Sequence, residues 1–222
     1  MGKYLKKFEN HSAYEAAESS LILPNVSLCV SEGDVYYNPA PDPYNGHDYV
    51  DLGLPSGTKW ATMNVGANSV TDYGNYYQYG KGAATYQETS GQTQYIGTEN
   101  PLASSADTAT QVWGGSWHMP TSAQCQELKE NTTQEGVTID GIYGVKFTAQ
   151  NGNYIFVPAS GYYKQRTTTV TDEGEWGSCH FWSSTPVDSY YAWFVSAGND
   201  RCNILNNPPM RSGGNTVRPV VG

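Results

Sequence analysis

From residue 45 to the end of the chain, Gly, Pro and Asn recur so often that every apolar or alternating segment between them is short. Segments of this length, closed by turn residues, are typical of strands, because helices usually need about 10 residues or more. A membrane-spanning helix would need about 20 consecutive apolar residues, and the sequence has no such run. The pattern therefore predicts a fold of short strands and long loops with few helices.

The polarity of the chain comes mainly from uncharged residues, which indicates a folded protein. Charged residues are only 15% of the 222 residues and aromatic residues are 13%, whereas disordered chains combine high charge with few aromatic residues. The formal net charge is −9, and binding to a nucleic-acid backbone needs a clustered cationic face. We therefore expect no nucleic-acid partner.

One helix is predicted after residue 45, at 122–129, with Thr121 as its N-cap and with Cys125 and Leu128 on one face. Residues 71–111 are predicted to form long loops. The predicted strands are Tyr49–Leu52, Lys59–Met63, Val137–Ile139, Gly144–Phe147, Tyr154–Val157, Tyr191–Val195 and Val217–Val220.

Residues 1–44 differ from the rest and are predicted to form an N-terminal attachment or oligomerisation segment. No apolar core of a secretory signal follows the basic residues at its start. An isolated two-stranded hairpin is only marginally stable in water, so we expect this segment to dock on another surface. Its expected parts are a helix at 12–18, strands at 25–30 and 35–37, and a stiff Pro-rich linker at 39–43 that leads to a ligand-binding domain at 45–222.

The sequence contains none of the common catalytic motifs. It has no G-x-S-x-G, no H-E-x-x-H, no Walker loop and no dinucleotide fingerprint. The acidic run at 172–175 is compatible with a cation site or a paired-carboxylate catalyst, but a solvated turn is the commoner explanation. Asn199, Asp200 and Asn203 could supply oxygen atoms to Ca²⁺, yet the EF-hand spacing is absent. We predict no catalytic residue, no metal ligand and no cofactor.

The four cysteines are too few and too widely spaced for a disulfide framework. Cys179 and Cys202 could come close in the fold and form a bridge. Without a visible export signal, reduced thiols are the default expectation.

The last 46 residues, 177–222, contain no Lys, Glu or Gln, although the rest of the chain holds 8 Lys, 11 Glu and 10 Gln. The segment is rich in Ser, Tyr, Asn, Gly, Trp and Arg. This mixture is typical of antibody-like binding loops, in which aromatic residues supply contact area and Ser, Asn and Gly supply hydrogen bonds. Strands and tight turns also disfavour Lys, Glu and Gln, so the composition alone leaves both explanations open.

A series of motifs runs along 47–222, at Tyr49–Ala61, Asn64–Ala67, Asp72–Gly80, Trp113–Thr121, Trp182–Thr185, Arg211, Gly214 and Val217–Val220. These motifs resemble, in that family's order, a paralogous domain of gut Bacteroidetes and their phages. This resemblance implies an α+β, C-type-lectin-like fold with short antiparallel strands, of the formylglycine-generating-enzyme-like branch, which includes the variable proteins of diversity-generating retroelements.

In those variable proteins, adenines are randomised in a cassette that typically begins near the Trp-Ser-Ser-Thr motif and ends before the terminal strand. Asn codons of the type AAY, once their adenines are varied, never encode Lys, Glu, Gln, Met or Trp. The missing Lys, Glu and Gln fit this rule, whereas Trp193 and Met210 would have to be fixed positions. An undiversified member of the family would look much the same.

Two departures from related proteins narrow the function that the resemblance implies. The sugar-binding triplets Glu-Pro-Asn and Gln-Pro-Asp and a Trp-Asn-Asp are absent, so the fold name does not imply sugar specificity. The enzyme branch needs two reactive cysteines close in sequence, and Cys179 and Cys202 lie 23 residues apart.

Residues 3–9 and 25–39 resemble leaders of Bacteroides phage and prophage proteins, which implies attachment to a virion or another assembly.

The binding surface is predicted from this resemblance and from strand alternation. The fold would pair the N- and C-terminal strands and so bring 49–52 near 217–220. In 191–195, alternation puts Tyr191, Trp193 and Val195 on the ligand side and Ala192 and Phe194 on the packed side, while Trp60, Trp113, Trp117 and Trp182 are assigned to the core. The predicted ligand-binding residues are His180, Asp188, Ser189, Tyr190, Tyr191, Trp193, Asn199, Asp200, Arg201, Asn203, Asn206 and Asn207.

Three function classes follow. The favoured one is a non-enzymatic binding module that recognises a protein or glycan receptor on a cell surface, carried on a virion or bacterial cell surface, as a possible homo-oligomer. The second is an undiversified structural or assembly protein of a phage or prophage. The third is an enzyme of the formylglycine-generating type.

Overall fold

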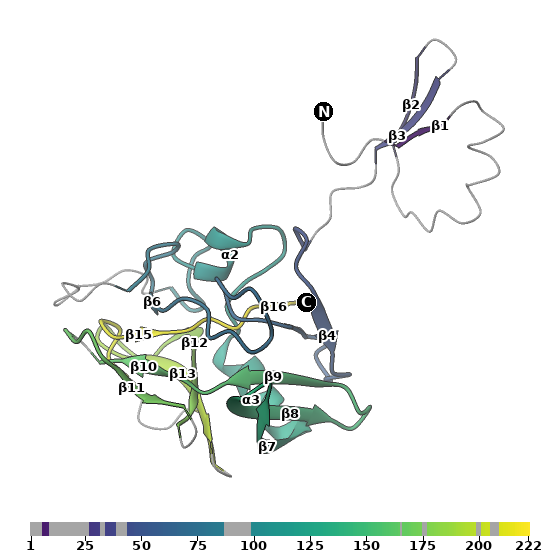
Figure 1. The fold of residues 1–222 in the computed structure, drawn as a ribbon. Helices are drawn as coiled ribbons and strands as arrows, with labels where there is room; N and C mark the ends of the chain where they lie inside the picture. Colours follow the sequence, from purple (N-terminus) through teal and green to yellow (C-terminus); the bar gives the residue numbers. More distant parts are fainter. Residues whose placement is uncertain are drawn as a thin grey trace. The chain divides into compact units, whose positions relative to one another are not determined.

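The fold is that of a computed structural model, in which the chain forms two compact units, Met1–Asn45 and Gly46–Gly222 (Figure 1). We describe each unit by itself. The structure describes residues 6–8, 27–31, 34–38, 44–86, 99–164, 166–174, 177–198, 201–204 and 209–222, and in 6–8, 27–31, 34–38 and 201–204 it describes the backbone alone.

The first unit contains a three-stranded antiparallel sheet. Its strands are β1 (Lys6–Phe8), β2 (Ser27–Ser31) and β3 (Asp34–Asn38), in the order β1-β3-β2. β2 and β3 overlap the predicted strands at 25–30 and 35–37, and β1 was not predicted. The predicted helix at 12–18 and the linker at 39–43 lie outside the described residues.

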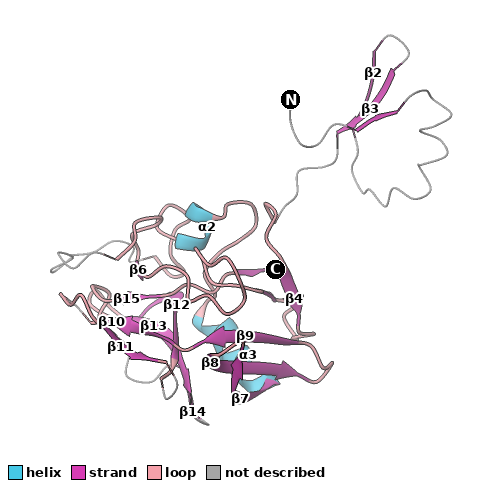
Figure 2. Ribbon diagram, viewed as in Figure 1, coloured by secondary structure: helices cyan, strands magenta, loops and turns pink. Residues whose placement is uncertain are grey.

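The second unit is built mostly of short antiparallel strands, with two short helices among its described residues (Figure 2). The prediction of short antiparallel strands with few helices is therefore confirmed for the described residues. No described helix is long and apolar enough to cross a membrane. The four sheets have the orders β16-β5-β4, β11-β10-β15-β6, β12-β13-β14 and β7-β8-β9. Their strands are β4 (Tyr49–Asp51), β5 (Lys59–Ala61), β6 (Tyr77–Gln78), β7 (Thr132–Ile139), β8 (Ile142–Ala149), β9 (Tyr154–Pro158), β10 (Ser160–Tyr163), β11 (Val170–Glu173), β12 (Cys179–Pro186), β13 (Ala192–Gly198), β14 (Arg201–Ile204), β15 (Gly214–Asn215) and β16 (Val220–Val221).

The predicted helix is present as α3 (Ser122–Asn131), and its local signals act as expected. Thr121 is the N-cap and forms a capping box with Gln124, while Cys125 and Leu128 are buried. A second helix, α2 (Thr108–Val112), lies in the stretch that was predicted to be loop. Asp107 caps it, because its carboxylate accepts a hydrogen bond from the Thr110 amide at 2.9 Å.

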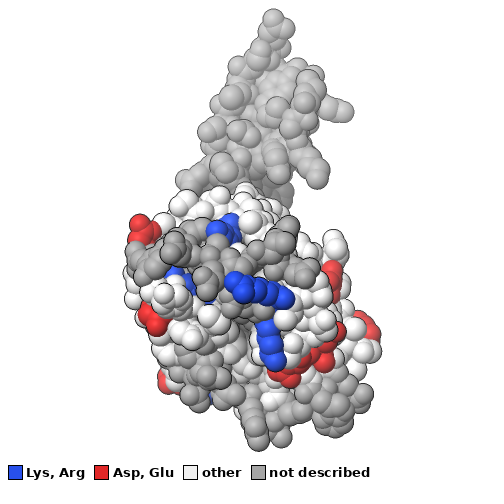
Figure 3. All heavy atoms as spheres, turned by 90° about the vertical axis from the view of Figure 1, so that its left-hand side faces the viewer, with Lys and Arg blue, Asp and Glu red and all other residues white. Residues whose placement is uncertain are grey.

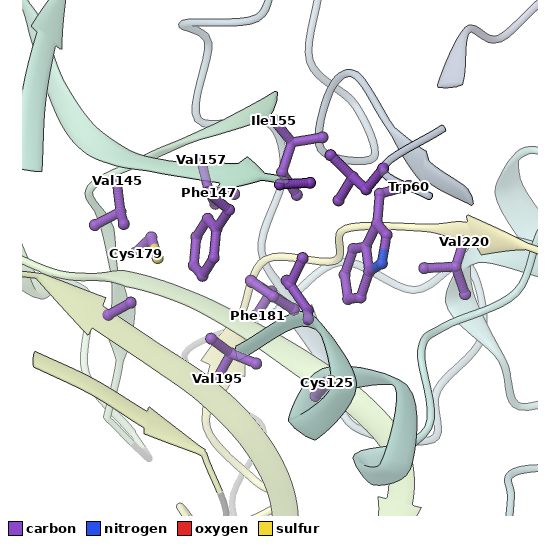
Figure 4. Close-up of a cluster of buried hydrophobic side chains, with 14 of the residues drawn as sticks. Trp60, Cys125, Val145, Phe147, Ile155, Val157, Cys179, Phe181, Val195 and Val220 are labelled. Carbon is purple, nitrogen blue, oxygen red and sulfur yellow. The ribbon is translucent and has the colours of Figure 1, made fainter. Parts of the chain in front are cut away.

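The main core lies between α3 and strands from three of the four sheets (Figure 4). Trp60 of β5 and Phe181 of β12 meet edge to face there, with ring centroids 5.9 Å apart. The prediction that four tryptophans belong to the buried interior is confirmed for Trp60, Trp113, Trp117 and Trp182.

Arg218 is fully buried and joins elements that are distant in sequence. Its Nη1 donates to the carbonyl oxygen of Ala61 at 3.1 Å, and its Nη2 donates to that of Phe156 at 2.9 Å. Burial lowers the pKa of this guanidinium to about 9, so it remains charged at neutral pH. The segment before β16 is thereby tied to β5 and to β9.

Two predicted proximities differ from the structure. β16 pairs with β5, and β5 pairs with β4, so the terminal strands share a sheet without being neighbours. Cys179 and Cys202 both lie opposite Ala197, on the two sides of β13. Their Cα atoms are therefore two strand spacings apart, about 9–10 Å, and a disulfide needs less than about 7 Å. The possible bridge between them is excluded.

Candidate functional site

The most exposed aromatic residues of the C-terminal segment gather at the connection between β12 and β13. Tyr190 is 64% exposed, Tyr191 38%, Val187 40% and Met210 39%. Tyr191 and Met210 face each other in an antiparallel bridge, and the Val187 amide donates to the Tyr191 carbonyl at 3.0 Å. We call Val187–Tyr191 together with Met210 the aromatic turn. It carries four large apolar side chains that are exposed on a short, hydrogen-bonded stretch of backbone.

Asp188 organises the backbone of this turn. Its Oδ1 accepts hydrogen bonds from the amides of Tyr190, at 2.7 Å, and of Tyr191, at 2.9 Å. A carboxylate that binds backbone amides two and three residues further on is a common way to close a tight turn. Asp188 was predicted to contact the ligand, and in this structure one of its oxygens fixes the two tyrosines.

Arg211 supports the turn from the protein interior. It is 5% exposed, and its Nε donates to the Tyr191 carbonyl at 3.2 Å, while its backbone amide donates to the Tyr190 carbonyl at 2.8 Å. Its guanidinium lies over the ring of Tyr79, 5.0 Å from the ring centroid. Both tyrosine carbonyls are thus held by one residue, which sequence reasoning did not assign to the site.

Strand β13 carries Trp193, which is half-buried, but the predicted division of its faces is wrong for Val195. Val195 is 0% exposed and belongs to the main core, opposite Phe181. Phe194 is also buried and stacks on His180, with centroids 5.5 Å apart. Both faces of β13 are therefore covered at Phe194 and Val195. The exposed part of the predicted surface lies where the strand begins, next to Tyr191.

His180 lies inside the protein, at 4% exposure, and is hydrogen-bonded to Asp172. The Nε2···Oδ2 distance is 3.1 Å, and the hydroxyl of Ser196 lies 3.5 Å from the same Nε2. The hydrogen bond with His180 lowers the pKa of the Asp172 carboxyl.

This histidine does not form a Ser-His-Asp relay. In such a relay the carboxylate binds one ring nitrogen and the hydroxyl the other. Here both groups approach Nε2, and Nδ1 is buried without a hydrogen-bond partner among the described residues. The arrangement joins β11 to β12, and no step of catalysis follows from it.

Some of the remaining predicted site residues are described and others are not. Ser189 is half-buried within the aromatic turn, and Arg201 and Asn203 lie on β14, of which the backbone is described. The predicted residues outside the described ranges are Asn199, Asp200, Asn206 and Asn207.

In the described part of the chain, no three His, Cys, Asp or Glu side chains gather as metal ligands would.

Figure 3 views the second unit from the side that carries β6, β15, β10 and β11 in Figure 1. Among the described residues on this face, most are uncharged, with a few basic side chains near the middle and acidic side chains toward the margin. A surface of this kind favours contacts through aromatic and hydrogen-bonding groups over long-range electrostatic attraction.

Comparison of the chain with protein families, with curated proteins and with solved structures gives no match.

Proposed function

We propose that this chain is a ligand-binding protein whose recognition surface is centred on the aromatic turn. The observation that carries the proposal is the 64% exposure of Tyr190 on a backbone that Asp188 and Arg211 hold in place. Exposed tyrosine on an ordered backbone supplies contact area at low entropic cost, and Tyr and Arg dominate binding hot spots. The expected ligand is a protein or glycan receptor on a cell surface.

We further propose that the second unit has a C-type-lectin-like fold and that its C-terminal segment is the variable cassette of a diversity-generating retroelement. Two observations support this. The stretch without Lys, Glu and Gln holds β12, β13, β14 and the aromatic turn. Its end, at β16, returns to a sheet shared with β4 and β5, which begin the unit. A variable surface on a fixed scaffold would have this layout.

Residues 1–44 are proposed to attach the binding unit to a virion or a bacterial surface structure. The leader-like sequence motifs and the separate compact unit at Met1–Asn45 support this role.

The binding proposal is tested by incubating the fluorescently labelled chain with intact cells of a panel of gut Bacteroidetes and with a glycan array. At least one cell type or glycan should retain the wild-type chain, and Tyr190→Ser should reduce that retention. Equal retention of both proteins would show that the aromatic turn is not the recognition surface.

The diversification proposal is tested in the genome that encodes the chain. We expect a reverse-transcriptase gene and a near-identical repeat of the 177–211 coding segment that differs only at adenines. A neighbourhood without such a repeat would leave an undiversified binding or assembly protein.

A further inference from the structure

The exposed apolar side chains of the second unit gather at the aromatic turn. Seven large apolar side chains are exposed in the described part of the chain, and four of them are Val187, Tyr190, Tyr191 and Met210. Tyr191 and Met210 are opposite each other in an antiparallel bridge, so their side chains lie on the same face with Cβ atoms about 5 Å apart. Clustered apolar exposure marks an interaction site, whereas single exposed apolar residues are normal.

The exposure of these side chains fits a protein partner better than a glycan. Small ligands are held in concave sites that cover most of their surface, but Tyr190, at 64% exposure, projects from the protein. Val187 and Met210 offer no strong hydrogen-bonding side-chain group, so sugar hydroxyls buried against them would lose their hydrogen bonds to water without replacement. Protein interfaces, in contrast, are enriched in Tyr and Met at their buried centre.

A carboxylate without a cationic partner belongs to the same turn. Asp188 is exposed and forms no ion pair with a described residue, while Arg211, which holds the turn, is buried. Membrane surfaces attract exposed basic residues rather than an acidic one. The charge of the turn therefore favours a partner that supplies a cation.

We propose that the ligand of the aromatic turn is a protein whose surface has an apolar pocket with a Lys or Arg side chain at its rim. Tyr190 fills the pocket, the apolar side chains beside it exclude water from the contact, and Asp188 pairs with the cation. A tyrosine in a desolvated pocket with such surroundings is the usual arrangement of a binding hot spot. This assignment rests on the proposed function and adds the chemical class of its ligand.

The test compares three preparations of the gut Bacteroidetes cells that retain the labelled wild-type chain. One is untreated, one is digested at its surface with proteinase K, and one is oxidised with periodate, which cleaves the vicinal diols of glycans. We expect proteinase K to abolish retention and periodate to leave it unchanged. Loss of retention after periodate would show a glycan ligand, and retention after both treatments would show a lipid ligand, so either result would overturn the proposal.

A matched pair of variants tests the apolar contact on untreated cells. Val187 is 40% exposed in the turn, and Val70 is 44% exposed outside it. Val187→Ser should weaken binding about fivefold or more, because apolar area buried in the complex is lost, while Val70→Ser should bind like the wild type. Equal affinities of the two variants would overturn the apolar contact.

A second pair tests the cation of the partner. Asp188→Asn removes the charge and keeps an acceptor oxygen for the amides of Tyr190 and Tyr191. Wild-type binding should weaken as the NaCl concentration rises, because salt screens the ion pair, and Asp188→Asn should lose most of this salt dependence. Asp140→Asn, at an exposed position between β7 and β8, should keep it. The same salt dependence in all three proteins would overturn the pairing with a cation.

Failure of the ligand class is distinguishable from failure of the binding function. Retention that falls in Tyr190→Ser but survives proteinase K would overturn the protein ligand alone. A wild-type chain that no cell type retains, or equal retention of Tyr190→Ser, would contradict the binding function and the protein ligand with it.

Discussion

The Nε atom of Arg211 donates a hydrogen bond to the carbonyl oxygen of Tyr191 at 3.2 Å, from a side chain that is almost completely buried. The exposed end of the proposed binding surface is therefore fixed to the interior through its backbone. Side chains at the surface can change without loss of this support.

Arg211→Met should lower the free energy of unfolding by about 2 kcal/mol, because a hydrogen bond from a charged group and a cation–π contact are lost. Urea unfolding followed by tryptophan fluorescence measures this change. Arg166→Met, at an exposed position, serves as the control and should change stability by less than about 0.5 kcal/mol. Equal losses in the two variants would contradict the bracing role of Arg211.

Asp188→Ala should loosen the aromatic turn while leaving the core intact. The amides of Tyr190 and Tyr191 lose their common acceptor, so their hydrogen exchange should accelerate, and stability should fall by about 1 kcal/mol or less. Asp188→Asn keeps an acceptor oxygen and should restore slow exchange. If both variants exchange like the wild type, the carboxylate does not organise the turn.

Acid should weaken the contact between Asp172 and His180. The pKa of Asp172 in the folded protein lies below its ordinary value of 3.8, so below that pH the unfolded chain binds more protons and stability falls. The contribution is complete above pH 3.8 and is lost as the pH falls through the folded-state pKa. Asp172→Asn should remove it, so the stability difference between wild type and variant should shrink on acidification.

Asp107 changes the stability of the protein with pH in the opposite direction to Asp172. Burial raises its pKa, so its carboxyl contributes stability that is lost as the pH rises from 3.8 through the folded-state value. The comparison of wild type with Asp172→Asn cancels this effect, because both proteins retain Asp107. A stability difference that does not change between pH 2 and 6 would contradict the assigned Asp172–His180 interaction.

Cys179 and Cys202 should not be linked to each other. Alkylation of the unfolded chain without reductant should modify both thiols, as measured by peptide mass spectrometry. A disulfide-linked peptide that contains the two residues would contradict the register of β12, β13 and β14.

Local signals predicted local structure well. Thr121, Gln124 and the apolar spacing of Cys125 and Leu128 specify α3 within one stretch of sequence, and that helix formed as expected. The same reasoning missed α2, although Asp107 is a favourable N-cap, because this helix spans only five residues in a polar stretch.

Contacts between distant segments could not be predicted in the same way. Alternation in β13 was interpreted as one buried and one exposed face, but Val195 packs in the main core and Phe194 packs on His180. A strand covered on both sides loses the period-two signal. Likewise, Asp172 was expected to lie in a solvated turn, but it lies in β11, and only the fold brings it to His180.

The most direct test of the account is the binding of three labelled chains to the same intact gut Bacteroidetes cells, measured as a function of chain concentration. The first is the wild type and the second is the double variant Tyr190→Ala/Tyr191→Ala, which keeps the backbone bonds of the aromatic turn. The third is Tyr154→Ala, which removes a tyrosine that is 45% exposed at the start of β9. We predict that the double variant binds at least about tenfold more weakly, since hot-spot residues contribute about 1–2 kcal/mol or more each, while Tyr154→Ala binds like the wild type. Wild-type affinity in the double variant, or an equal loss in Tyr154→Ala, would contradict the assignment of the aromatic turn as the ligand-binding surface.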